Sequence, residues 1–167
     1  LIGGDDAFGE EANYFNGAVV LLAKVCGCHP SIFGLVLTQR TNHSMADEFC
    51  PRSAAAYPAF ANNSVFLGGP VGPYWSVLSP KPTRGGFPIA PGVHVVGSLG
   101  QAHADVLRGE LAAEDVRFYS GYAAWPISRL EHEVAQGKWR VALPSQQLLA
   151  DGLASGGLRQ LLEAQLR

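Results

Sequence analysis

Cys26, Cys28 and His29 form the segment best suited to chemistry, because thiolate and imidazole groups are good ligands for zinc and copper. A structural zinc site normally closes with a second, distant pair of ligands. Only Cys50 and four isolated histidines remain to supply that pair, so an ordinary turn between two strands is the favoured interpretation. A thiol redox sensor at Cys26 and Cys28 is kept as an alternative. We expect no bound metal and no cofactor.

Motifs for nucleophilic or phosphoryl chemistry are missing from the sequence. It holds no Gly-x-Ser-x-Gly elbow, no His-Glu-x-x-His pair and no Walker loop. Gly68-Gly69-Pro70 is rich in glycine, but a phosphate cradle needs a helix directly after it, and here prolines and a strand follow. Ser120 and His132 could be named as a catalytic pair, but any domain of this size contains such combinations of serine and histidine. The sequence therefore predicts a protein that is not an enzyme.

The composition predicts one domain, over residues 1–167, with a surface poor in charge. Charged residues make up 16% of the chain and apolar residues 47%, with a net charge of −2. The longest apolar stretch, residues 17–23, is much too short to cross a membrane as a helix. Neutral surface costs less to desolvate than charged surface, and this favours a protein as the partner.

A nucleic-acid role is the second alternative. Binding to duplex DNA needs a concentrated basic face, whereas the basic residues of this chain are mostly scattered singly. Lys138 and Arg140 lie close together in the sequence. With Arg40 they are the contact residues expected of a regulator that touches nucleic acid.

Apolar runs and turn residues predict a mixture of strands and helices. Strands are expected over 17–23, 33–38, 64–68, 75–79, 93–96, 116–122 and 138–143, the third and fourth of them paired across a glycine- and proline-rich turn. The second proline-rich segment, 80–91, is expected to be an irregular loop, with one helical turn near 45–49.

Three serines mark the starts of helices in the last third of the chain. Ser98, Ser128 and Ser145 are placed to cap helices, and Ser128 forms a capping box with Glu131. Gly109 is placed to end the first helix in a left-handed turn. Leucines over 158–166 mark a terminal amphipathic helix.

Three segments together carry a resemblance to a known family. Phe33-Gly-Leu-Val-Leu37, Phe66-Leu-Gly-Gly-Pro-Val71 and Arg117-Phe-Tyr-Ser-Gly-Tyr-Ala-Ala-Trp125 occur in this order, and the chain resembles the AlgH/YqgE family over nearly its whole length. The resemblance implies an α+β fold in which a bifurcated mixed β-sheet is folded into a pseudo-barrel with peripheral helices. It implies no catalytic activity, and bacterial relatives are linked to transcriptional regulation.

Two departures and two further segments refine this resemblance. Thr38-Gln39-Arg40 stands where the family usually has Asn-Arg-Pro, and Ala124 replaces a glycine, so an activity seated at that corner is expected to be lost. Pro91-Gly-Val-His94 and Ala113-Glu-Asp-Val-Arg-Phe118 are similar to the plant and algal branch. That branch implies a chloroplast protein, in the stroma or on the stromal face of the thylakoid, imported with a transit peptide that is then removed. The alternative location is the bacterial cytoplasm.

The sequence thus predicts a non-enzymatic binding module that docks on a larger protein complex, as an assembly, repair or regulatory factor. Any contact with a membrane would be peripheral and made through the partner. Loops on a rigid scaffold are the usual place for such contacts, and Trp125-Pro126 is expected to expose aromatic surface. The expected contact residues are Tyr74, Trp75, Lys81, Arg84, Phe87 and Trp125.

Overall fold

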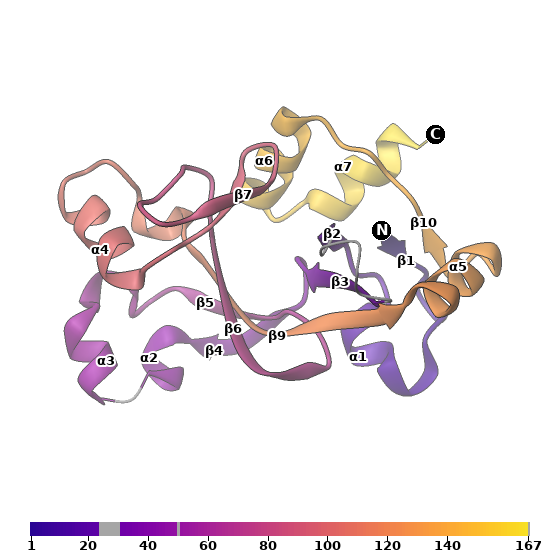
Figure 1. Cartoon of the computed structure of the whole chain (residues 1–167), viewed down its shortest axis with the longest axis horizontal. Helices are drawn as coiled ribbons and strands as arrows, with labels where there is room; N and C mark the ends of the chain where they lie inside the picture. Colours follow the sequence, from indigo (N-terminus) through magenta and orange to yellow (C-terminus); the bar gives the residue numbers. More distant parts are fainter. Residues whose placement is uncertain (24–30, 50, 167) are drawn as a thin grey trace.

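The computed structural model describes residues 1–23, 31–49 and 51–166, and shows a curled β-sheet with helices packed around it (Figure 1). The main sheet has eight strands, six of them in the order β2-β3-β9-β6-β8-β7, with β5 and β4 branching from β9. Its strands are β2 (Val20–Ala23), β3 (Ser31–Val36), β4 (Arg40–Ser44), β5 (Ser64–Leu67), β6 (Val71–Ser79), β7 (Phe87–Ala90), β8 (Val93–Val95) and β9 (Arg117–Pro126). A small second sheet pairs β1 (Ile2–Gly3) with β10 (Trp139–Arg140).

Strand β9 is the point where the main sheet divides. One edge of β9 pairs with β5 in parallel near its start and with β3 in antiparallel near its end. The other edge pairs with β6. The sheet therefore forks at β9 and curls into a half-barrel, and this confirms the α+β fold class with a bifurcated sheet.

Helices cover the sheet in three groups, each over its own part of the core (Figure 1). Helices α6 and α7 pack with Leu35, Leu78 and Tyr119, whereas α5 packs on a cluster that includes Trp125 and Trp139. Helix α4 packs on the far side of β9, against Phe118. The helices are α1 (Ala12–Phe15), α2 (Met45–Glu48), α3 (Pro51–Ala56), α4 (Leu99–Leu107), α5 (Ile127–Ala135), α6 (Gln146–Ser155) and α7 (Leu158–Gln165).

Two of the three predicted helix caps are confirmed. The hydroxyls of Ser98 and Ser145 accept hydrogen bonds from backbone amides three residues later. The capping box at Ser128 is wrong, because α5 begins at Ile127 after Pro126 and the serine lies inside the helix. A capping box does form elsewhere, where Ser44 and Asp47 start the short helix α2.

Strand pairing departs from expectation in two places. Strands β5 and β6 do not pair with each other, because β9 lies between them and pairs with both. The strand expected over 138–143 ends at Arg140, and Leu143 is 87% exposed rather than on a buried face. Local apolar patterning cannot show which strand arrives from a distant part of the chain.

Three shorter elements also differ from the sequence-based expectation. The proline-rich segment 80–91 is not wholly irregular, because its end forms β7, which pairs with β8 at an edge of the sheet. An edge position tolerates Pro88, since proline cannot donate to a central ladder. Strand β4 and helix α3 form where a loop was expected around the single helical turn of α2.

Candidate functional site

Gly121 sets which side chains of β9 face the inside of the curled sheet. Its φ of 77° is in the left-handed region, and this inserts an irregularity into the strand. Before it, Tyr119 is on the same face as Leu78 of β6; after it, Tyr122 lies on that inner face too. The register shift beside Val71 on the paired strand β6 is at the same place. Both tyrosines therefore face inward although they are three residues apart.

An apolar groove lies inside the half-barrel, between the β2–β3 edge and the β7–β8 edge. Its volume is about 670 Å³, within the range of roughly 300–1,000 Å³ that is usual for binding sites. Among the described residues of its lining, none has a charged side chain. The lining consists of Leu21, Phe33, Gly34, Leu35, Ser76, Leu78, Phe87, Pro88, Ile89, Val95 and Tyr122.

Aromatic side chains extend this groove to the molecular surface. Tyr74 is 62% exposed and its ring centroid lies 5.6 Å from that of Tyr122. The Tyr122 ring in turn lies 5.6 Å from that of Phe33 on the neighbouring strand β3, between ring centroids. Phe87 is 57% exposed on the β7 edge. Exposed aromatic rings beside an apolar groove are typical of a site that binds another apolar surface.

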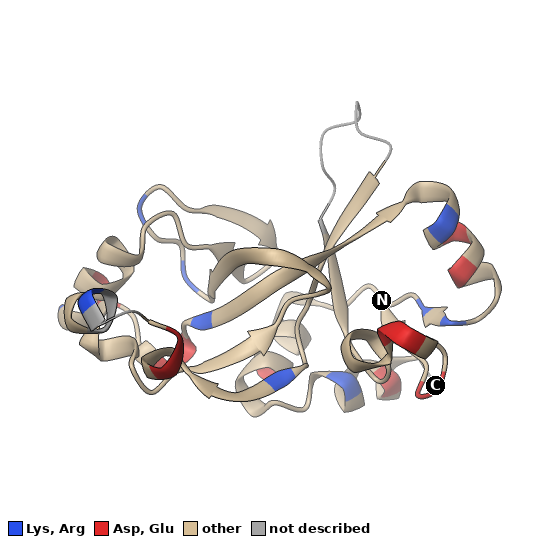
Figure 2. Ribbon diagram, turned by 90° about the horizontal axis from the view of Figure 1, so that it is seen from below, with Lys and Arg blue, Asp and Glu red and all other residues tan. Residues whose placement is uncertain are grey.

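Charged residues lie mostly away from this groove. Figure 2 shows the strands of the main sheet largely free of charge, with Lys, Arg, Asp and Glu gathered on the helices and loops at both ends. The described lining of the groove therefore presents apolar surface rather than charge.

Comparisons with known proteins place this architecture in a family. The model of the AlgH-like family, DUF179, matches residues 8–165. The chain belongs to the AlgH-like family. A relative from Anaeromyxobacter dehalogenans, described as a UPF0301 protein, is 30% identical over 145 residues, which cover 79% of this chain and 70% of that protein. A UPF0301 protein from Mycobacterium tuberculosis is 38% identical over 92 residues, 52% of this chain and 46% of the relative.

Two solved structures share the AlgH-like fold with this chain. The solution structure of the AlgH protein from Pseudomonas aeruginosa superposes with a TM-score of 0.62 at 18% identity, covering 95% of this chain and 85% of that one. A crystal structure of a protein from Corynebacterium diphtheriae gives the same TM-score and identity, covering 87% and 75%. At this identity the likeness shows the fold alone.

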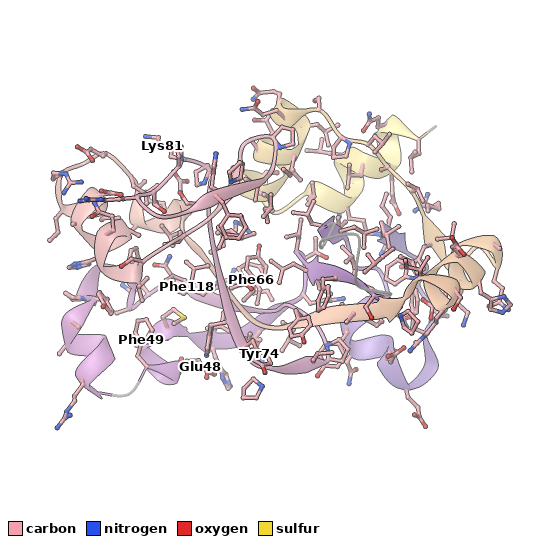
Figure 3. The ribbon with its side chains drawn as sticks, viewed as in Figure 1. Glu48, Phe49, Phe66, Tyr74, Lys81 and Phe118 are labelled. Atoms are coloured by element: carbon pink, nitrogen blue, oxygen red, sulfur yellow. The ribbon has the colours of Figure 1, made fainter. Side chains whose placement is uncertain are left out.

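The structure brings only part of the expected contact set of this AlgH-like chain to the groove. Phe87 lines it and Tyr74 borders it, but Trp75 is the next residue along β6 and faces the opposite side of the sheet. Lys81 and Arg84 are exposed in the loop between β6 and β7, and Figure 3 places Lys81 and Tyr74 at opposite ends of the β6 region. The six residues therefore do not form one surface.

The expected exposure of Trp125 is wrong. Its side chain is 1% exposed, because β9 continues past Gly121 and pairs Trp125 with Ile32 of β3. The indole packs edge-on against Trp139, with ring centroids 5.9 Å apart, and tilted against Phe15 at 5.3 Å. The Trp-Pro pair resembles a surface turn in sequence, but here it ends a central strand.

The three basic residues expected to contact nucleic acid do not lie together. Arg40 starts β4, whereas Arg140 is in β10, at the other end of the molecule in Figure 1. Arg140 forms an ion pair of 2.5 Å with Glu163, and Lys138 is half-buried. No concentrated basic face joins these residues.

The corner that departs from the family pattern is occupied by structural contacts. The Thr38 hydroxyl accepts a 3.0 Å hydrogen bond from the Val19 amide, and the Gln39 side chain donates one of 3.0 Å to the Asn16 carbonyl. These bonds fix the start of β2 against the end of β3. Of the three residues at this corner, Arg40 is the one that is exposed to solvent and lines a cleft.

The part of the chain that the structure describes contains neither grouped metal ligands nor a helix that could span a membrane. Within residues 1–23, 31–49 and 51–166, no three His, Cys, Asp or Glu side chains are grouped to hold a metal ion. Cys26, Cys28, His29 and Cys50 lie outside the described residues. No described helix is long and apolar enough to span a bilayer.

Sequence reasoning missed Phe33 and Tyr122 as groove residues. Each was assigned to a strand, but the inward direction of Tyr122 depends on the irregularity at Gly121. The Gly121-Tyr122 pair inside an otherwise apolar strand is the signal that could have revealed it.

Proposed function

We propose that this chain is a non-enzymatic docking module, and that its groove receives an extended, uncharged segment of a subunit of a larger protein complex. The single observation that carries this proposal is that the described residues lining the groove are all uncharged and lie beside the exposed rings of Tyr74 and Phe87. The proposed role is that of an assembly, repair or regulatory factor.

The chemistry of the groove supports a binding role over a catalytic one. General acid–base catalysis relies most often on His, Asp, Glu or Lys side chains, and none of these is among the described residues that line the groove. Burying an apolar segment there would gain roughly 25 cal/mol for each Å² removed from water. An uncharged segment avoids the cost of desolvating an ion.

The surroundings of the groove favour a partner with acidic flanks. Arg84, in the loop that leads into β7, is exposed and makes no ion pair within the described residues, and Lys81 in the same loop donates a 2.8 Å hydrogen bond to the Glu110 carbonyl. Arg84 is three residues before Phe87, so an acidic residue that follows the docked segment beyond Phe87 would come toward the Arg84 guanidinium. Such rim charges mainly raise the association rate and select the partner.

A photo-crosslinking amino acid at position 87 tests this proposal. The variant chain is irradiated in its native extract, and the trapped partner segment is identified by mass spectrometry. A matched variant carries the same group at Leu107, which is 73% exposed on α4 and does not line the groove. We expect one partner segment, uncharged and apolar, trapped at position 87 only.

A synthetic peptide of the trapped segment then completes the test. It should bind the purified chain, and Phe87→Ser should weaken its affinity by about ten-fold or more, whereas Leu107→Ser should leave it unchanged. Equal trapping at both positions, a charged trapped segment, or a peptide insensitive to Phe87→Ser would each refute docking in the groove.

We further propose that the docking takes place in a chloroplast, on the stromal side. Support comes from the segments Pro91–His94 and Ala113–Phe118, whereas the relatives named above are bacterial. A fluorescent fusion of the complete precursor, expressed in its own host, should colocalise with chlorophyll. Diffuse fluorescence outside the plastid would refute the location without touching the docking proposal.

A further inference from the structure

A second, polar cleft lies between the β4–β5 pair and the start of β9. It has a volume of about 410 Å³ and shares no lining residue with the apolar groove. Two arginines, Arg40 and Arg117, line it, and neither forms an ion pair within the described residues. Two arginines from different strands therefore line one cleft.

Arg117 is held in place before any ligand arrives. Its guanidinium carbon lies 5.2 Å from the centre of the Phe66 ring, and its Nη2 donates a hydrogen bond to the Leu153 carbonyl. The side chain is only partly exposed. A cation ordered by a ring and a carbonyl loses little further entropy when it binds an anion.

Arg40 lies beside Phe66 on the neighbouring strand β4. Its Cα pairs directly with that of Phe66 in the β4–β5 ladder, so the two side chains lie on the same face of the sheet. Strand β4 pairs only with β5, so Arg40 is on an edge and is exposed to solvent. Phe66 thus has an arginine from each neighbouring strand, one fixed and one free to move.

The walls of the cleft are tied together by Asn63. Its side-chain amide donates hydrogen bonds of 2.8 Å to the Ala113 carbonyl and 2.6 Å to the Val116 carbonyl. These bonds hold the turn before β5 against the segment that leads into Arg117. Asn62 and Ser64, on either side of Asn63, add neutral hydrogen-bonding groups to the lining.

We propose that this cleft binds a small phosphate-bearing molecule, with the phosphate between Arg40 and Arg117 and an organic group against the Phe66 ring. Phosphate suits the site because its several oxygens and its charge near −2 can engage two guanidinium groups at once. The cleft is larger than a phosphate ion, and the ring offers an apolar surface for the remainder of the molecule.

Glu114 also lines this cleft and makes no ion pair with either arginine. Its carboxylate repels a bound phosphate and so weakens the affinity for a dianion. Replacing it with the neutral, nearly isosteric glutamine should therefore strengthen binding. A variant that loses structure would bind phosphate more weakly, so a gain in affinity on Glu114→Gln distinguishes a specific site from a general loss of structure.

Phenyl phosphate is the probe that tests the proposal, because it carries both the phosphate and a ring. Binding is followed by calorimetry and by the amide NMR shifts of residues 40, 64 and 117. Arg40→Gln should weaken binding by about five-fold or more, and Glu114→Gln should strengthen it by about two-fold or more. Arg84→Gln removes an exposed cation that does not line this cleft, and it should leave the affinity for phenyl phosphate unchanged. Arg40 is exposed to solvent, so the Arg40→Gln variant should keep the fold.

Four outcomes would overturn the proposal. The first is that phenyl phosphate shows no saturable binding at millimolar concentration, and the second is that Arg40→Gln and Arg84→Gln weaken its affinity equally. The third is that the Glu114→Gln variant binds phenyl phosphate more weakly than the parent. The fourth is that benzoate binds as tightly as phenyl phosphate. Inorganic phosphate binding more weakly than phenyl phosphate is the expected result. It would show that the Phe66 side of the cleft contributes to the affinity.

Discussion

The backbone at Gly69 crosses Gly121 so closely that a Cβ on Gly121 would collide with the carbonyl oxygen of Gly69. The two glycines belong to two of the three segments that carry the resemblance to the family, Phe66–Val71 and Arg117–Trp125. Both segments are therefore needed for one crossing, where the turn after β5 lies against the middle of β9. Neither motif contributes a polar side chain to it.

We predict that Gly121→Ala destabilises the protein far more than Gly109→Ala. The strain of a left-handed alanine costs about 1–2 kcal/mol at either position, and the collision with Gly69 should bring the total at position 121 above about 3 kcal/mol. Gly109 has a similar φ of 72° but open space around it. Urea denaturation gives both free energies of unfolding, and equal losses would show that the crossing relaxes at little cost.

Glu133 is predicted to be a structural carboxylate beside the core cluster that contains Trp125 and Trp139, called here the second core cluster. It is buried, accepts a 2.9 Å hydrogen bond from the Trp139 indole, and accepts one of 2.8 Å from Arg129 Nε. Glu133→Ala should cost about 2–4 kcal/mol, because it leaves the indole N–H unpaired. Glu133→Gln should recover part of this loss, and Glu131→Ala, at an exposed position on the same helix, should be nearly neutral. A fully stable Glu133→Ala variant in thermal or urea unfolding would contradict this role.

Tyr119 predicts a loss of stability in alkali. Burial raises the pKa of Tyr119 to about 12, although the positive charge of Arg117 opposes the shift. The folded state keeps the phenol proton between about pH 10 and 12 while the unfolded state releases it, so stability falls as the pH rises through this window, by about 2–3 kcal/mol in all. Below pH 10 this contribution is fully present.

The Tyr119→Phe variant isolates that effect. The Tyr119 hydroxyl has no hydrogen-bond partner within the described residues, so the variant should be at least as stable as the parent at pH 7. Its free energy of unfolding should fall less steeply than the parent's between about pH 10 and 12. Parallel curves for the parent and Tyr119→Phe would count against the raised pKa.

Quenching of tryptophan fluorescence by a solute in water should come mainly from Trp75. Trp75 is 45% exposed, whereas Trp125 and Trp139 are almost fully buried. Acrylamide should therefore quench the parent protein measurably, and Trp75→Phe should remove most of that quenching. Strong residual quenching in Trp75→Phe would mean that the second core cluster opens to solvent.

Features fixed by neighbours in the chain could be predicted well. The caps at Ser98 and Ser145 and the helix end at Gly109 depend on residues within one helical turn, and all three form as expected. The resemblance supplied the bifurcated sheet, which local patterning alone does not show.

Features decided by distant segments could not be predicted in this way. The proline- and glycine-rich turn after β5 is typical of a hairpin, yet it carries the chain across β9 instead of back along β5. Trp125 is buried because β3, some ninety residues earlier in the sequence, pairs with it. The groove has the same origin, since its walls come from β2 and β3 on one side and from β7 and β8 on the other.

The fork at β9 also has a consequence for how the chain acquires its shape during synthesis. Strands β3, β5 and β6 leave the ribosome before β9, and each of them pairs with it. Until residues 117–126 have emerged, these earlier strands lack the one segment that joins them. We therefore expect nascent chains that stop before Arg117 to stay loosely collapsed and to depend on chaperones, and folding to be slow because its decisive contacts span long stretches of sequence.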